Sequence, residues 1–136
     1  MRFAPTIEGL SAGDLAGFFV GWPDPPSPDV HLRMLSGSDF VWLAYDAERP
    51  VGFITAVSDD VLSAYIPLLE VLPSHQGRGI GRELTRRMLD SLSHLYMIDL
   101  LCDEELQPFY ARLGMRRAAG MLVRNYNRQS GASEEQ

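Results

Sequence analysis

The stretch that most constrains this chain is the junction at residues 66–91. An apolar segment ends at Pro73, glycines alternate at Gly77, Gly79 and Gly81, and apolar residues then recur at mostly four-residue intervals from Ile80 onwards. This order predicts a strand, a loop and a helix that begins near Ile80. The first N–H groups of a helix lack intrahelical partners, and glycines let an anion approach the backbone. The junction therefore predicts a site for a phosphorylated ligand.

The glycine spacing excludes two familiar nucleotide-binding loops. A P-loop needs Gly-x-x-x-x-Gly followed by Lys and Ser or Thr, and no such Lys follows here. A dinucleotide-binding loop needs Gly-x-Gly-x-x-Gly. Counted from Gly77, the third glycine falls one position early, at Gly81, and counted from Gly79 the third position is Leu84. What fits is Gln-x-x-Gly-x-Gly, at Gln76, Gly79 and Gly81.

This motif resembles the pyrophosphate-binding motif of the GNAT superfamily of acetyl-CoA-dependent N-acetyltransferases. The residues before it, Val71-Leu72-Pro73, are similar to the end of that family's fourth strand. Residues 109–115, Phe-Tyr-Ala-Arg-Leu-Gly-Met, are similar to the family's Phe-Tyr-x-x-x-Gly-Phe segment. The resemblance covers roughly residues 3–128. The competing interpretation is an ordinary glycine-rich turn with a coincidental Phe-Tyr pair.

The resemblance implies an α/β GNAT fold. Its mixed central sheet would have six to seven strands and about four helices, and would be splayed between the fourth and fifth strands. We expect strands at residues 6–10, 40–45, 51–57, 62–72, 96–102 and 121–126, and helices at residues 11–19, from 28, from about 80, and at 105–113. Pro67 removes a ladder donor from the fourth of these strands, which predicts a bulge, a bend or an unpaired position there. We expect one domain over residues 1–128 and a polar, disordered tail at 129–136.

Composition narrows the class of protein. A chain of 136 residues is the size of one domain, and its formal charge of −6 argues against a nucleic-acid partner. No apolar run approaches the ~20 residues of a membrane span, and the first residues lack the apolar stretch of a signal peptide. Cys102 is the only cysteine, which excludes an intrachain disulfide and a cysteine-based zinc site. We expect a cytoplasmic protein that needs no metal and binds neither nucleic acid nor membrane.

The resemblance implies acetyl-CoA as the acyl donor. The pyrophosphate would be held by the backbone N–H groups of the loop, at Gly77, Arg78, Gly79, Ile80 and Gly81. Three side chains would lie beside it: Gln76, Arg78 and Arg82. The two arginines could equally form a solvated helix face. The backbone of Val71 and Leu72 would pair with the pantetheine arm, and the Leu72 N–H would polarise the thioester carbonyl. Phe109, Tyr110 and Asp103 complete the expected cofactor side, with Asp103 standing where the family often has asparagine.

Two residues are candidates for proton transfer. Tyr110 matches the family's tyrosine, and a phenol with a pKa of ~10 stays protonated at neutral pH and can protonate a thiolate; the alternative is a core tyrosine. Glu70 is the leading general base, because a carboxylate in an apolar strand is costly to bury. Its alternative is an ion pair or a solvent-facing position, and His75 is the second candidate base. Cys102 is expected to be a small apolar residue rather than a nucleophile.

The sequence does not specify the molecule that accepts the acetyl group. In the family the acceptor side is built from the first helices and the last strands, which points to Trp22, the proline-rich residues 22–28 and His31, and to Asn125 and Tyr126. An aromatic wall with nearby carboxylates would suit a small cationic amine, so a small-molecule N-acetyltransferase is expected. An enzyme acting on protein amines and a non-catalytic acyl-CoA-binding protein remain alternatives. Dimerisation is common in the family, so a homodimer is left open as a partner.

Overall fold

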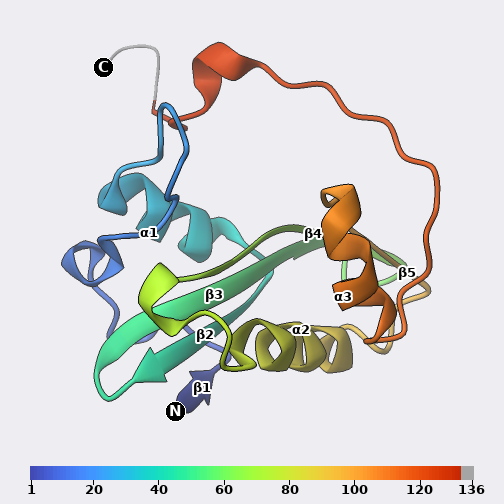
Figure 1. Ribbon diagram of the computed structural model, residues 1–136, viewed down its shortest axis with the longest axis horizontal. Helices are drawn as coiled ribbons and strands as arrows, with labels where there is room; N and C mark the ends of the chain where they lie inside the picture. The colour runs from blue at the N-terminus through green and yellow to red at the C-terminus, as the bar shows by residue number, and fades with distance from the viewer. Residues whose placement is uncertain (133–136) are drawn as a thin grey trace.

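A single mixed sheet forms the centre of the molecule (Figure 1). The structure is a computed structural model that describes residues 1–132. The sheet contains five strands in sequence order: β1 (Arg2–Ala4), β2 (Phe40–Asp46), β3 (Arg49–Ser58), β4 (Ser63–Val71) and β5 (Met97–Asp99). Neighbouring strands are antiparallel except β4 and β5, which are parallel. The expectation of six to seven strands is therefore wrong.

The described residues form three α-helices, where about four helices were expected. They are α1 (Pro28–Gly37), α2 (Ile80–Ser91) and α3 (Gln107–Ala111). Four 3₁₀ turns accompany them: η1 (Ala12–Leu15), η2 (Pro73–His75), η3 (Glu104–Leu106) and η4 (Tyr126–Arg128). The start of α1 agrees with the sequence prediction, because Ser27 caps it by accepting the Val30 N–H at 3.2 Å and proline occupies its first turn. The helix expected at residues 11–19 is only the short turn η1.

Helices cover both faces of the sheet, and each face has its own core. The apolar side of α2 packs on one face, where it meets alternate strand residues such as Ala44 and Ile54. The intervening residues, among them Leu43 and Phe53, face the other core with η1 and α1. This alternation is the period of two expected of a strand with both faces covered.

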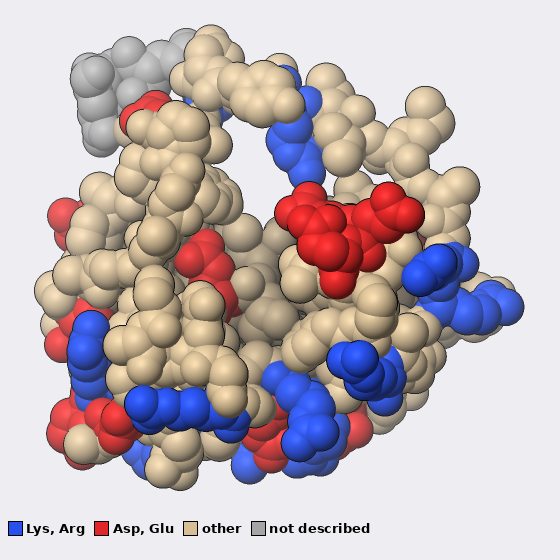
Figure 2. Space-filling model, in the orientation of Figure 1, with Lys and Arg blue, Asp and Glu red and all other residues tan. Residues whose placement is uncertain are grey.

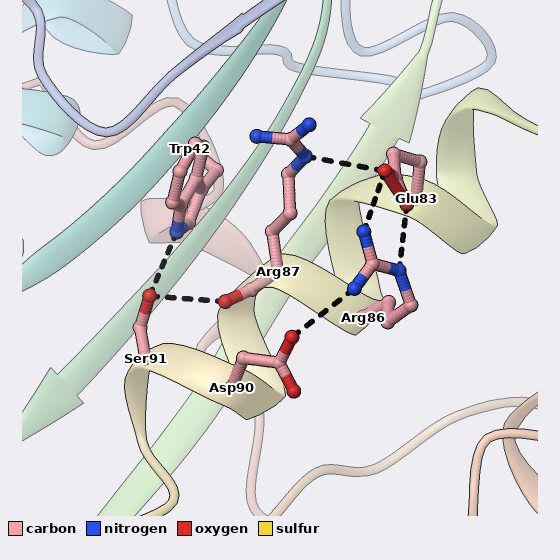
Figure 3. A network of polar contacts seen from close by, with 6 residues as sticks. All are labelled: Trp42, Glu83, Arg86, Arg87, Asp90 and Ser91. Atoms are coloured by element: carbon pink, nitrogen blue, oxygen red, sulfur yellow. Dashed lines mark hydrogen bonds and ion pairs between the residues drawn. The ribbon is translucent and has the colours of Figure 1, made fainter.

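A network of polar contacts runs along α2 and joins it to β2 (Figure 3); it is made by Trp42, Glu83, Arg86, Arg87, Asp90 and Ser91. Arg86 lies 2.7 Å from Glu83 and 3.2 Å from Asp90, and Arg87 lies 3.3 Å from Glu83. The indole N–H of the β2 tryptophan donates to the serine at the end of the helix at 3.0 Å. Two arginines of α2 are thus engaged with carboxylates of the same helix, whereas Arg82, in its first turn, has no such ion pair within the described chain.

Strand β4 is bulged at Pro67, as predicted. Thr55 of β3 stands opposite Leu68, but Val57 stands opposite Tyr65, so the register shifts across Pro67. On its other side β4 pairs with β5 only as far as Tyr65. Beyond that residue the edge of β4 is open, and the two strands separate in the manner expected from the resemblance.

The largest departure from the sequence prediction follows α3. Residues 121–126, expected to form a last strand, are not part of the sheet. The chain instead arches away from the sheet and returns beside α1 (Figure 1). We call residues 116–125, which form this arch, the strap. The apolar run Met121-Leu122-Val123 within it favours a strand, but a strand forms only where another backbone edge is within reach.

The chain beyond the strap is attached to the region around α1. The Asp24 N–H donates to Gln129 Oε1 at 2.8 Å, and Arg33 donates to the carbonyl of Gly131 at 3.3 Å. The first residues of the tail expected at 129–136 thus make contacts with the chain around α1. Residues 133–136 of that tail lie outside the described residues.

Candidate active site

A cleft of about 560 Å³ lies where β4 and the chain after β5 separate. Its floor is β4 with the residues that follow it, and its sides are the 17–22 loop, residues 100–103, and α3. Figure 2 shows this face hollowed, with an acidic side chain inside the hollow and a group of acidic side chains at its rim. The predicted site residues that line the cleft are Trp22, Glu70, Val71, Leu72, Gln76, Asp103 and Tyr110.

The direction of the backbone groups along β4 corrects one predicted role. The Leu72 N–H donates to the Val51 carbonyl at 2.8 Å, so it points into the sheet. The Val71 carbonyl accepts the side-chain amide of Gln76 at 3.0 Å, on the opposite edge. Because the N–H and C=O of one residue in an antiparallel strand point the same way, the Val71 N–H also borders the cleft. The backbone donor predicted at Leu72 is therefore at Val71.

The glycine loop has the shape of an anion cradle. Gly77 and Gly79 adopt φ values of +78° and +81°, and a Cβ at either position would meet open space. Their conformation, rather than crowding, is what favours glycine here. Gly79 is the N-cap of α2 and carries no side chain to satisfy the first N–H groups of the helix. The side chain of Ile80 is buried in the core, so only its backbone is available to a ligand.

Gly81 brings the helix close to the cleft. A Cβ added there would lie 3.8 Å from the Val71 side chain and 3.9 Å from the ring of Phe109. Phe109 in turn packs edge-on against Tyr110, with ring centroids 4.9 Å apart. The two family-like motifs, far apart in sequence, therefore meet at the start of α2.

The donor groups present fit a diphosphate. Free helix N–H groups, open space beside two glycines and exposed guanidinium groups of Arg78 and Arg82 are the features such an anion needs. Arg78 already reaches back to the Ser74 carbonyl at 3.4 Å, a contact too long to hold it firmly. Asp103 lies exposed in the cleft lining, where it offers an acceptor and no amide donor.

Glu70 is half-buried in the cleft floor. Its Oε1 accepts the backbone N–H of Phe19 at 2.8 Å, which fixes the carboxylate against the 17–22 loop. Burial raises the pKa of Glu70 above its usual range, and the hydrogen bond from Phe19 opposes that rise. Phe19 itself has φ +62°, a left-handed conformation that is rare for an aromatic residue. No salt bridge involves Glu70 among the described residues, so the ion-pair alternative does not apply.

Tyr110 lines the cleft from the α3 side. Burial, with a smaller contribution from the nearby Cys102, raises the pKa of its phenol above the ordinary value. The pKa of the Cys102 thiol is also raised, by burial and by the charges of Asp103 and Glu105. A thiol with a raised pKa is a poor nucleophile, which agrees with the structural role expected for it.

Two of the predicted acceptor and base residues lie away from the cleft. His31 is buried between Phe18, Phe19 and Phe53, with ring centroids 4.5–5.4 Å away. Neither of its ring nitrogens has a hydrogen-bond partner among residues 1–132, and burial lowers its pKa to about 4. It does not line the cleft, whereas Trp22 does, stacked edge-on against Phe19.

His75 has both ring nitrogens engaged. Its Nε2 lies 2.8 Å from Asp46 Oδ2, and its Nδ1 lies 2.7 Å from the hydroxyl of Ser74. Because it is buried and fully bonded, it has no nitrogen free to accept a proton from a substrate. The contact instead ties the β2–β3 turn to the chain entering the glycine loop, and the same hydrogen bond lowers the pKa of Asp46.

The strap contributes residues that the sequence did not single out. Leu122 and Arg124 line the cleft, while the expected Asn125 and Tyr126 do not. Alternation is the one signal that could have found them, since residues 122 and 124 share a face of any extended segment. The sequence does not indicate which face of the segment lies toward the cleft.

In the described chain, no group of three or more His, Cys, Asp or Glu side chains is placed to hold a metal ion. No described helix combines the length and apolar character needed to cross a membrane.

The comparisons with known proteins agree with this geometry. The sequence model of the "Acetyltransferase (GNAT) family" matches residues 8–115. Among curated proteins, the chain is 30% identical over 114 residues to GCN5-related N-acetyltransferase 1, chloroplastic, of Arabidopsis thaliana, covering 80% of this chain and 58% of that protein. It is 34% identical over 113 residues to Serotonin N-acetyltransferase 2, chloroplastic, of rice (Oryza sativa subsp. japonica), covering 78% and 56%. The chain thus spans a little over half the length of these curated relatives.

Solved structures extend the agreement to the fold. A crystal structure from Deinococcus radiodurans R1, assigned to the acetyltransferases, has a TM-score of 0.93 and 44% identity, covering 97% of this chain and 93% of that one. A GNAT family acetyltransferase from Streptococcus pneumoniae TIGR4 has a TM-score of 0.75 and 28% identity, covering 91% and 97%. With the splayed β4 edge, the glycine cradle and these matches together, the chain belongs to the GNAT family of acetyltransferases.

Proposed function

We propose that this protein transfers an acetyl group from acetyl-CoA directly to the primary amine of a small molecule. The observation that carries the proposal is the cleft itself. A half-buried carboxylate, Glu70, and a phenol of raised pKa, Tyr110, line it from two different elements. The glycine loop opens beside it, with Gln76 in its lining. A base, an acid and an anion cradle around one cavity are what acyl transfer to an amine requires.

The donor would be held by backbone groups. The N–H groups from Gly77 to Arg82 would bind the diphosphate, and the open edge of β4 would pair with the pantetheine amides. When bound, acetyl-CoA supplies a thioester whose C–S bond breaks as the amine nitrogen forms the new amide bond. The Val71 N–H, directed to the cleft edge, is available to hydrogen-bond the acyl oxygen as negative charge develops there.

Two side chains would move the protons. Glu70 would take a proton from the acceptor ammonium, directly or through a water, because its raised pKa makes it a stronger base than an exposed carboxylate. Tyr110 Oη would keep its proton through the neutral range and give it to the departing sulfur. In both cases burial raises the pKa, which makes Glu70 a stronger base and keeps Tyr110 protonated.

The strap favours a small acceptor over a peptide. Leu122 and Arg124 of the strap line the cleft, so the strap limits the space that an extended peptide would need. Trp22 offers an apolar wall, and Glu70 with Asp103 gives the lining carboxylates that attract a cationic amine. An enzyme acting on protein amines would need an open groove at this position.

The test is acetyl-CoA turnover, followed as thiol release, with polyamines, arylalkylamines, aminoglycosides, amino acids and peptides. We expect turnover with at least one small amine and a rate ~10²-fold or more lower for Tyr110→Phe. The control is Tyr96→Phe, which alters an exposed tyrosine and should leave the rate unchanged. Turnover confined to peptides would support the protein-acetylating alternative. Tight coenzyme A binding without thiol release for any amine would support a non-catalytic protein.

A further inference from the structure

We propose that the acceptor carries a carboxylate as well as its primary amine, on an apolar or aromatic frame, so that its class is the apolar amino acids. Arg124 of the strap is the residue that selects the carboxylate. This acceptor class rests on the proposed function, because it concerns the molecule that receives the acetyl group in the same cleft. It follows from the kinds of side chain that line the cleft and from the elements that carry them.

Charged side chains of both signs line the cleft. Within the described chain, Arg124 is the one cationic side chain in the lining, and Glu70 and Asp103 are the anionic ones. An acceptor that is only a cation is repelled by a guanidinium group, whereas a zwitterion is attracted by groups of both signs. The lining therefore suits an acceptor that carries an anionic group in addition to its ammonium group.

The guanidinium group of Arg124 has donors available for an anion. Its hydrogen bond within residues 1–132 runs from Nη1 to the carbonyl of Val123 at 3.4 Å, which is long for a hydrogen bond. No ion pair joins Arg124 to a carboxylate of the described chain, the two in the cleft included. The remaining N–H groups keep the planar fork that binds a carboxylate through two parallel hydrogen bonds.

Arg124 differs in position from the arginines expected to bind the donor. Arg78 and Arg82 stand at the glycine loop, beside the expected diphosphate, and neither belongs to the lining of this cleft. Arg124 joins that lining from the strap, a segment outside both family-like motifs. Because the cations for the donor phosphates lie at the glycine loop, the cation in the cleft is left for the acceptor.

Apolar side chains in the same lining describe the rest of the acceptor. Leu122 shares a face of the strap with Arg124 and is 60% exposed, and Val20 of the 17–22 loop is 67% exposed. Trp22 adds an aromatic surface from the same loop. Exposed apolar side chains around a cavity mark a surface that a ligand covers. An apolar or aromatic side chain on the acceptor would cover them.

An amino acid of this kind has a group for each part of the cleft. Its ammonium group gives one proton to Glu70, and the free amine nitrogen then bonds to the acetyl carbon. The C–S bond breaks and the sulfur takes the proton of Tyr110, while the second proton lost by the nitrogen restores the phenol. The carboxylate stays paired with Arg124 throughout. Arg124 is therefore a specificity-determining residue and takes no part in the chemistry.

The experiment compares amino acids with the amines that lack their carboxylates. Acetyl-CoA turnover is followed as thiol release with apolar and aromatic α- and ω-amino acids, each beside its decarboxylated counterpart, such as tryptophan beside tryptamine. We expect kcat/KM to be at least ~10-fold higher for the amino acid in the best pair, as a charge-assisted hydrogen bond provides. A kcat/KM that is equal or higher for the amine in every pair would overturn this proposal and leave the proposed function intact. Absence of turnover with every small amine and amino acid would overturn the proposed function, and the acceptor class with it.

Variants of the strap show whether Arg124 causes the preference, because a carboxylate also alters the basicity of the amine beside it. We expect the preference for the amino acid to fall ~10–100-fold in Arg124→Gln and to fall less in Arg124→Lys, which keeps the charge and loses the planar fork. Arg117→Gln is the matched control, since Arg117 is an exposed arginine of the strap outside the lining of the cleft, and its preference should equal that of the wild type. All three changes lie at exposed positions, so none is expected to impair folding. An unchanged preference in Arg124→Gln would overturn the role of Arg124, and so would a raised KM for acetyl-CoA in its place, because Arg124 would then bind the donor.

Discussion

Glu70 combines two tasks in one side chain. Its Oε1 holds the Phe19 N–H at 2.8 Å, which stabilises a left-handed residue in the loop that forms one wall of the cleft. Among the described residues, the same carboxylate is the only glutamate in the lining of the cleft. Because burial raises its pKa, the charged form is less stable in the folded chain than in the unfolded chain. A carboxylate whose charged form is destabilised by burial is a candidate catalytic group, because it does not stabilise the fold.

Replacing Glu70 tests whether the residue serves catalysis rather than stability. We expect Glu70→Gln to lower kcat by ~10²–10³-fold while the melting temperature stays equal or rises, since the amide oxygen can still accept from Phe19 and no buried charge remains. The acid limb of the pH–rate profile should disappear with it. Glu104→Gln, at an exposed carboxylate near the cleft, is the control and should keep the wild-type profile. An unchanged kcat for Glu70→Gln would remove the residue from the mechanism.

His31 is a residue whose burial is costly to the fold. Its folded pKa is about 4, below the ordinary value of 6.5, and its ring nitrogens have no hydrogen-bond partner in the part of the chain that the structure describes. A histidine with a depressed pKa binds its proton more tightly when unfolded. Stability is therefore complete above pH 6.5 and is lost as the pH falls towards 4.

We expect chemical denaturation to show a free energy of unfolding that declines over this acid range, and a smaller decline in His31→Leu. The leucine variant should also be more stable at pH 7, because it removes an unsatisfied buried polar group worth about 1–3 kcal/mol. His94→Leu is the control, since His94 is exposed beside Asp60. Identical pH dependence in wild type and His31→Leu would show that His31 does not titrate in this way.

At the scale of an element, the junction of β4, the glycine loop and α2 was predictable in detail. Gly79 takes the left-handed N-cap position, and the helix begins at Ile80 as the apolar spacing indicated. The direction of individual N–H groups was not predictable, because the bulge at Pro67 shifts the parity of β4. That shift is why the available donor is at Val71 and not at Leu72.

Gly79→Ala is expected to affect both binding and stability. A Cβ at φ +81° costs about 1–2 kcal/mol even though the surrounding space is open. We expect a lower melting temperature and a KM for acetyl-CoA several-fold higher, because relief of the strain moves the first N–H groups of α2. Gly37→Ala is the control, since it lies in α1 at a φ that alanine accepts. An unchanged KM would mean that the loop does not bind the donor in this conformation.

At the scale of the whole molecule, binding at the cradle should stabilise the fold. A ligand that binds only the folded state adds about 2.7 kcal/mol at a hundred times its dissociation constant. For a chain of this size we expect coenzyme A to raise the melting temperature by roughly 5–10 °C. Pantetheine, which lacks the diphosphate, is the control and should raise it far less. Equal shifts for the two compounds would place the binding energy outside the glycine loop.

The sequence by itself determined the parts that depend on neighbouring residues. The glycine spacing, the start of α1 after Ser27, the hairpin of β2 and β3, and the break in β4 at Pro67 are all set by local conformation and by periodicity. The glycine spacing, together with the segment at residues 109–115, was enough to predict the family whose model matches residues 8–115.

Only the tertiary structure decided the rest, because the deciding contacts join distant segments. Glu70 meets Phe19 across fifty-one positions, and His31 is enclosed by three aromatic side chains, two from the 17–22 loop and one from β3. The strap has the sequence of a strand, yet whether it forms one depends on which backbone edge lies beside it. No local sequence pattern specifies that edge. The course of residues 116–125, and their contribution to the lining of the cleft, are therefore decided by the tertiary structure.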